Sequence, residues 1–111
     1  MFVCDYVNYR IQVFGVDGSF ARQWGTLGSG QGEFEYPRSL AVSNGEVLVS
    51  DYLNDRIQVF DVAGTFLRQW GTEGSGEGQL YGACGLTVSG GEVYVCDQQN
   101  NRVVVFGPDG S

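Results

Sequence analysis

Three loops of this chain carry an aspartate, an asparagine and an arginine at one spacing, Asp-x-x-Asn-x-Arg. They are Asp5/Asn8/Arg10, Asp51/Asn54/Arg56 and Asp97/Asn100/Arg102. A ring of such carboxylates could hold a cation, because hard cations prefer oxygen ligands. Alternatively, the Asp and Asn side chains cap their own turns while the arginine pairs with the carboxylate. Since the pattern recurs in every copy, and functional sites are usually added to a fold at one place, we favour the structural role.

Two other features could bind ligands. Trp24 and Trp70, each followed by Gly-Thr, could stack on bases or sugars. An aromatic residue that ends a strand ahead of a glycine is also what packing between sheets requires, and we favour packing. The glycine-rich stretches 25–32 and 71–78 have the composition of phosphate-binding loops, but they lack Gly-Lys-Ser/Thr and neighbouring glutamates would repel phosphate. We expect these stretches to carry the chain between structural units.

The chain contains no histidine. It therefore lacks the most frequent general base, the histidine ligands of zinc and the histidine of a Ser-His pair. We expect no catalytic residue, no metal ligand and no cofactor in this chain, which predicts that it is not an enzyme. A calcium site made of carboxylates alone would need residues beyond those present.

Short strands must position these residues. In the middle of the chain, apolar residues 39–43 lead to Asn44-Gly45, a strong two-residue hairpin signal, and residues 46–51 return. Residues 56–60 and 65–70 supply two more strands, and no helical periodicity is present. Val47, Leu48 and Val49 are consecutive apolar residues, so both faces of their strand should be buried. Four antiparallel strands recurring every 46 residues predict an all-β chain made of β-propeller blades.

Residues Val49 to Phe60, followed by Gly64 and Trp70-Gly71, resemble the blade pattern of the NHL-repeat family. That pattern is hydrophobic-x-Val-x-Asp-x-x-Asn-x-Arg-Ile-x-Val-Phe, then a glycine turn and an outer strand ending in an aromatic residue. The resemblance covers essentially the whole chain. It implies a six-bladed propeller that acts as a docking platform. Some members belong to tripartite-motif ubiquitin ligases, some bind RNA, some are sensor domains of kinases, and a related group are lyases with a histidine-bound metal.

The repeat divides the chain into a partial blade at residues 1–27, a complete blade at 28–73 and a partial blade at 74–111. The first unit lacks its first strand and the last stops before its fourth. About two and a half blades result, whereas a closed propeller typically has 4–8. Met1-Phe2-Val3 leads directly into the repeat without a signal peptide. We therefore expect a fragment whose remaining blades lie in a larger chain, or chains that associate to close the ring.

Positions at which the copies differ are informative about function, because the fold does not dictate them. They lie in the loop entering the first strand and in the loop between the second and third strands, which strand alternation places on one rim. The candidate binding residues are Tyr9, Glu35, Tyr36, Arg38, Tyr52, Asp55, Tyr81 and Asn101. Exposed tyrosine and arginine often anchor protein interfaces, although solvated loops also vary.

The net charge is −7, and all six basic residues are arginines. Five of them recur at repeat positions and only Arg38 is unpaired, so little positive charge is available for nucleic acid. We expect a neutral or basic protein partner, bound by the rim of a non-catalytic scaffold. In a ligase-like parent this scaffold would dock the substrate. The alternatives are an RNA-binding propeller and a part of a metal-assisted lyase or hydrolase. No apolar run is long enough to span a membrane.

The chain has three cysteines. Cys4 and Cys96 hold the same repeat position with Ser50 between them, and residues two units apart cannot form a disulfide. Cys84 could lie near Cys96 across a hairpin. Unpaired thiols favour a reducing, intracellular compartment.

Overall fold

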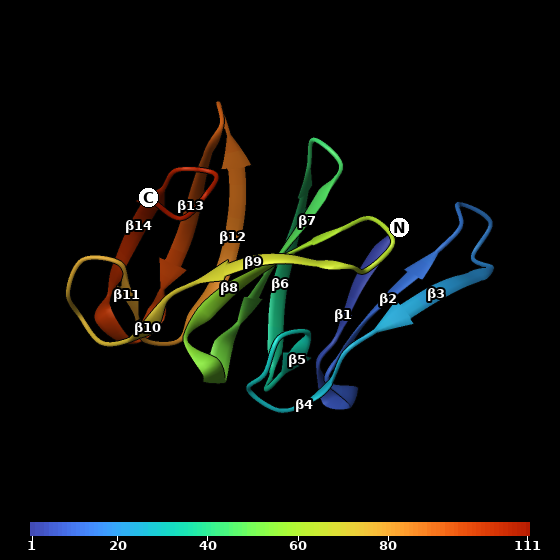
Figure 1. Ribbon diagram of the computed structural model, residues 1–111, viewed down its shortest axis with the longest axis horizontal. Coiled ribbons are helices and arrows are strands. Elements are labelled where there is room, and N and C mark those ends of the chain that lie inside the picture. Colours follow the sequence, from blue (N-terminus) through green and yellow to red (C-terminus); the bar gives the residue numbers. More distant parts are fainter.

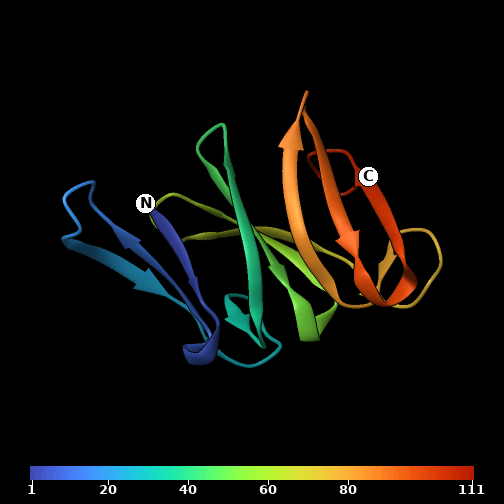
Figure 2. The same cartoon turned by 180° about the vertical axis from the view of Figure 1, so that it is seen from behind.

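The computed structural model describes all 111 residues. Its three larger sheets are antiparallel and lie side by side in an open arc (Figures 1 and 2). The first sheet has strands β1 (Phe2–Asp5), β2 (Arg10–Phe14) and β3 (Phe20–Trp24). The middle sheet has β6 (Pro37–Ser43), β7 (Glu46–Asp51), β8 (Arg56–Asp61) and β9 (Phe66–Trp70). The last sheet has β12 (Ala83–Ser89), β13 (Glu92–Asp97) and β14 (Arg102–Phe106). No α-helix is present, and no helix could cross a membrane.

The middle sheet confirms the four predicted strands, in the order β6-β7-β8-β9. Asn44 and Gly45 both have positive φ, 51° and 75°, as the two-residue turn of a tightly twisted hairpin requires. That turn pairs Ser43 with Glu46 across β6 and β7. The fold is therefore all-β, with propeller blades that do not close into a ring. The division of the chain at residues 27/28 and 73/74 stays a prediction.

The apolar core lies in two layers, one on each face of the middle sheet. Val47 and Val49 pack with Phe60 and with Ile11 of the first sheet. Leu48 points to the opposite face and belongs to a cluster shared with the last sheet. All three consecutive residues of β7 are buried, with exposures of 0%, 3% and 0%. The prediction that both faces of this strand are buried is confirmed.

The two glycine-rich segments that connect neighbouring sheets, residues 25–34 and 71–80, are called the crossings below. They contain more regular structure than the sequence indicates. Each forms a two-stranded parallel ribbon: β4 (Thr26–Leu27) pairs with β5 (Glu33–Phe34), and β10 (Thr72–Glu73) pairs with β11 (Gln79–Leu80). The ribbons end in Phe34 and Leu80, which are fully buried between sheets. Each crossing therefore fills the seam between two blades as well as connecting them.

Three short 3-10 helices lie at one end of the blades, between the second and third strands of each repeat. They are η1 (Tyr6–Asn8), η2 (Tyr52–Asn54) and η3 (Gln98–Asn100). In Figure 1 this end is the lower edge, opposite the β6–β7 and β12–β13 turns. The loops that carry the candidate residues therefore share one rim.

Candidate functional site

The Asp-x-x-Asn-x-Arg loops form polar clusters that hold the chain together. In the middle blade, Asp51 is fully buried and accepts hydrogen bonds from Asn54 Nδ2 at 2.8 Å and Arg56 Nε at 3.0 Å. It also accepts the backbone N–H of Glu35 at 2.8 Å. The last blade repeats this arrangement around Asp97. The predicted pairing of arginine with carboxylate is present.

The predicted capping of the turn by the aspartate is wrong. None of the three aspartates makes a side-chain capping bond to its own 3-10 helix. The free carboxylate oxygen of Asp51 instead reaches the backbone of residue 35, which lies 16 positions earlier. Asn54 likewise donates to the carbonyl of Gly28 in the preceding crossing at 2.8 Å. The cluster therefore joins a blade to the crossing that enters it, a contact that the sequence spacing does not reveal.

The arginines complete this connection. Arg56 donates from its terminal nitrogens to the carbonyls of Ser29, Gly30 and Glu33 at 2.7, 2.9 and 2.7 Å. Arg102 does the same for the second crossing, at the carbonyls of Ser75, Gly76 and Gln79. Arg10 has no crossing in front of it and bonds only to Asp5. These arginines are structural, and no group of three or more Asp, Glu, Cys or His side chains is arranged to hold a metal ion.

The pKa values of Asp51 and Asp97 are shifted in opposite directions. Desolvation raises the pKa of Asp51, against the opposing hydrogen bonds from Asn54, the Glu35 N–H and Arg56. Desolvation also acts to raise the pKa of Asp97, but the bonds from the Tyr81 N–H, Asn100 and Arg102 outweigh it and lower that pKa. The difference follows position, because the middle blade is covered on both faces.

The two tryptophans pack between blades, as expected. The ring centroids of Trp24 and of Phe60 in the next blade are 5.5 Å apart, and those of Trp70 and Phe106 are 5.8 Å apart. Arg22, two residues before Trp24, donates from Nε to the carbonyl of Val62 at 2.8 Å. Neither indole N–H has a hydrogen-bond partner. The tryptophans are therefore largely occupied by packing and do not form an exposed stacking platform.

The most distinctive feature of the rim is a chain of aromatic rings with an arginine over it. Tyr6 and Tyr36 are stacked, with ring centroids 4.8 Å apart and an interplanar angle of 25°. Tyr36 also meets Tyr52, at 5.6 Å. The guanidinium carbon of Arg38 lies 5.7 Å from the Tyr36 centroid and 5.1 Å from that of Tyr52, within cation–π range. We refer to Tyr6, Tyr36, Arg38 and Tyr52 as the tyrosine cluster.

The eight candidates occupy three settings on this rim. Tyr36, Arg38 and Tyr52 belong to the tyrosine cluster. Asp55 and Tyr81 line a hollow beside Tyr52. Tyr9, Glu35 and Asn101 lie on the same rim with no side-chain hydrogen bond; Tyr9 and Asn101 are the left-handed residues that end η1 and η3. Tyr6 is absent from the candidates, although its repeat equivalence to Tyr52 could have identified it.

The cysteines are all free. Cys84 Sγ lies 3.5 Å from the backbone carbonyl of Cys96, so the expected proximity across the hairpin is present. Burial raises the pKa of Cys4 to about 12, which keeps that thiol protonated.

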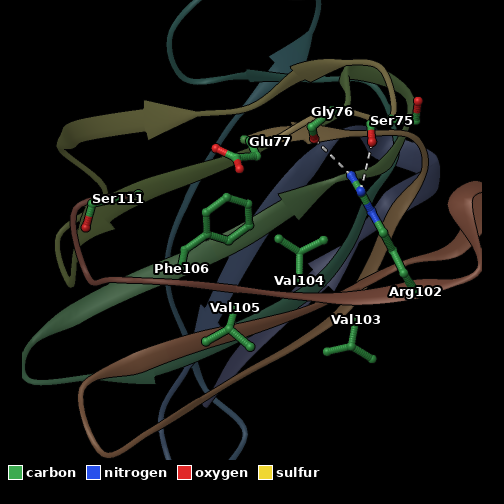
Figure 3. Close-up of a pocket in the computed structure, with 11 residues that line it drawn as sticks. Ser75, Gly76, Glu77, Arg102, Val103, Val104, Val105, Phe106 and Ser111 are labelled. Atoms are coloured by element: carbon green, nitrogen blue, oxygen red, sulfur yellow. Dashed lines mark hydrogen bonds between the residues drawn. The ribbon is translucent and has the colours of Figure 1, made fainter.

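The largest hollow lies away from the candidate residues, along the outer edge of β14 (Figure 3). It has a volume of about 680 Å³ between Arg102–Phe106 and the crossing at Ser75–Gly78. In the middle blade β9 pairs with the corresponding edge of β8, whereas β14 has no such neighbour. Val103 is 62% exposed, whereas its repeat counterpart Ile57 is fully buried against the next sheet. This hollow marks an unpaired sheet edge.

Comparison with known proteins gives matches in sequence and in fold. The NHL repeat family model matches residues 34–60 and 80–106. RING finger protein nhl-1 of Caenorhabditis elegans is 45% identical over 47 residues, which cover 42% of this chain and 5% of that protein. The computationally designed Ika4 protein superposes with a TM-score of 0.58 at 18% identity, over 90% of this chain and 55% of that one. The chain thus spans a small part of nhl-1 and about half of Ika4, and the likeness to Ika4 concerns the fold alone.

Proposed function

Because this chain is built from NHL repeats, we propose that it is a non-catalytic scaffold that binds a protein partner through the rim carrying the tyrosine cluster. The single observation that carries the proposal is the cluster itself. Tyrosine and arginine are the residue types most often found as anchors of protein interfaces. Here three tyrosines and one arginine from three separate segments meet at one place, and Tyr6 is 48% exposed.

The backbone of Tyr36 supports a role for its ring beyond packing. Tyr36 has φ of 82°, a left-handed conformation that a bulky residue rarely adopts. Its repeat counterpart is Gly82, with φ of 77°. The fold therefore requires a positive φ at this position and accepts glycine there. A tyrosine at such a position costs on the order of 1–3 kcal/mol, and such strain is concentrated at functional sites.

Charge favours a protein over nucleic acid as the partner. The chain has a net charge of −7 and the tyrosine cluster contains one positive side chain, Arg38. Nucleic-acid binding needs several cations along one surface. A neutral or basic protein surface suits the rim better. By analogy with the RING finger protein that it matches, the chain would form the substrate-docking part of a ubiquitin-ligase-like parent.

Site-specific crosslinking tests this proposal. A photoreactive benzoyl-phenylalanine replaces Val7, which is 67% exposed beside Tyr6 on the rim. The matched control replaces Val16, which is fully exposed in the β2–β3 turn at the other end of the blades. In an extract, we expect protein adducts at position 7 that are absent at position 16 and are lost with Tyr36→Gly. Equal adducts at both positions, or adducts removed by ribonuclease and high salt, contradict the proposal.

A further inference from the structure

A hollow of about 270 Å³ opens on the rim at the seam between the middle and last blades. It is lined by η2 and the residue after it, by β10 at the start of the second crossing, by the two residues after β11 and by η3. The lining residues are Tyr52, Leu53, Asp55, Glu73, Tyr81, Gly82 and Gln99. It adjoins the tyrosine cluster through Tyr52. The inference below rests on the proposed function and assigns a ligand group to this part of the rim.

One repeat position that lines the hollow differs between the two seams. In the first seam this position is Tyr36, and its ring stacks on Tyr6 with centroids 4.8 Å apart. In the second seam the same position is Gly82, and the repeat counterpart of Tyr6 is Tyr52. A Cβ placed on Gly82 would lie 3.0 Å from Gln99 Cγ and 3.2 Å from Tyr52 Cε2. No aromatic ring therefore stacks on Tyr52 from position 82, and the smaller Gln99 side chain lies there, its Nε2 donating to the Tyr52 hydroxyl at 3.1 Å.

The charge of this hollow is also peculiar to the second seam. Asp55 and Glu73 both line it, and no arginine does. Their counterparts in the first seam are the uncharged Tyr9 and Leu27, so the fold does not require either carboxylate. Asp55 is 7% exposed, and its Oδ1 accepts the N–H of Gly82 at 2.8 Å, which fixes the position of that carboxylate.

Within the tyrosine cluster, the Tyr52 ring lies against a planar cation. The Arg38 guanidinium already lies 5.1 Å from the centroid of the Tyr52 ring. A guanidinium is planar and weakly hydrated, stacks on aromatic rings and pairs with carboxylates, whereas an ammonium does not stack. We propose that the hollow beside Gly82 binds the guanidinium of an arginine side chain of the partner protein, stacked on Tyr52 and paired with Asp55 and Glu73.

Titration with three short peptides tests the assignment. The probes are acetyl-Gly-Arg-Gly-amide, the lysine analogue and the citrulline analogue, which keeps the shape of arginine without its charge. They are added to the ¹⁵N-labelled chain and followed by NMR. We expect the arginine peptide to shift the amides of Gly82, Gln99 and Tyr52 saturably. The citrulline peptide should bind about tenfold more weakly, because the charge-assisted hydrogen bonds are lost.

Matched substitutions separate this site from a general effect of negative charge. Asp55→Asn keeps an acceptor for the Gly82 N–H and copies Asn101, which has the same left-handed backbone at the equivalent position. Combined with Glu73→Gln, it should weaken binding of the arginine peptide by about tenfold. Glu77→Gln removes a nearby exposed charge that does not line this hollow and should leave binding unchanged.

Four results overturn the assignment: no binding of the arginine peptide, equal binding of the citrulline peptide, tighter binding of the lysine peptide, or an unchanged affinity in the Asp55→Asn/Glu73→Gln variant. Failure of the proposed function has a different signature. If protein adducts form at position 7 while the arginine peptide does not bind, the arginine site alone is refuted. If the peptide binds while no protein adduct forms at position 7, the guanidinium site stands and the protein-docking role of the rim is refuted.

Discussion

Arg10, Arg56 and Arg102 form a matched series within one chain, because they hold the same repeat position in different surroundings. Each donates from Nε to the aspartate five residues earlier, at 2.8, 3.0 and 2.8 Å. Their side-chain exposures are 31%, 6% and 34%. Only the second and third also hold the carbonyls of a crossing. Substitution of each by alanine therefore separates the local ion pair from the connection between blades.

The expected losses of unfolding free energy differ several-fold. Arg10→Ala removes a partly exposed ion pair, which contributes about 0.2–1 kcal/mol. Arg56→Ala leaves the fully buried Asp51 without its cation and removes one donor from each of three crossing carbonyls, of which Gly30 and Glu33 keep a second donor, and breaking a buried pair costs about 3–5 kcal/mol. Arg102→Ala should lie between them, about 1–3 kcal/mol, because water reaches two of the three carbonyls that it leaves.

Urea and thermal unfolding, followed by the fluorescence of the two tryptophans, measure these losses. For a chain of 111 residues, a change of 1 kcal/mol shifts Tm by about 4 °C. We expect Tm to fall by up to about 4 °C for Arg10→Ala and by about 12–20 °C for Arg56→Ala. If Arg56→Ala does not fold, Arg56→Lys keeps the charge but cannot reach three carbonyls at once, and should lose an intermediate amount.

Equal losses at Arg10 and Arg56 would refute this reasoning. That result would mean that the ion pair within each loop carries all the stabilisation and that the crossing contributes none. A smaller loss at Arg56 than at Arg10 would refute it more strongly.

Three further predictions concern single groups. Gly64→Ala should destabilise the fold by about 1–3 kcal/mol in urea unfolding, because its Cβ would lie 2.7 Å from the Trp24 ring at a φ of 97°. Hydrogen bonds from Arg68 lower the pKa of Glu46 in the folded chain. The ionised Glu46 therefore stabilises the fold above its usual pKa of 4.5, and this contribution is lost as the pH falls through the lower pKa of the folded state. Glu46→Gln should make Tm depend less on pH in that range. Iodoacetamide should alkylate Cys4, whose pKa burial raises to about 12, at least about tenfold more slowly than an exposed thiol.

Each of these has an internal control. Gly45→Ala places a Cβ in open space at a φ of 75° and should cost less than Gly64→Ala, so an equal cost would remove the tryptophan contact as the cause. Glu92 is the repeat counterpart of Glu46 but has no arginine partner. Glu92→Gln should therefore leave the fall of Tm at acid pH unchanged. Cys96 is exposed, and alkylation of Cys4 at the rate of Cys96 would contradict the burial argument.

Much of the fold follows from the sequence because strands and turns depend on neighbouring residues. The Asn44-Gly45 hairpin, the four strands of the middle unit and the burial of Val47, Leu48 and Val49 were all predicted from local patterns, and the structure confirms them. The ribbon pairs within the crossings were not predicted, since two-residue strands between glycines carry no periodicity.

The rim that carries the tyrosine cluster was predicted only in part. Divergence between the copies pointed to Tyr36, Arg38 and Tyr52, which the structure brings together with Tyr6. Sequence comparison cannot tell which divergent positions touch, and it gave the same weight to Asn101, which lies apart from the cluster.

The sequence by itself determined the repeat, its strands and the polar positions that recur in every copy, because these reside in spacing and in alternation along one segment. Only the tertiary structure decided what those positions contact. Asp51 reaches residue 35 instead of capping its own turn, Arg56 holds the crossing ahead of it, and Gly82, the repeat counterpart of Tyr36, lines a hollow beside Tyr52. These contacts join segments far apart in the chain, so they exist only once neighbouring blades have packed face to face and set the distances between their loops.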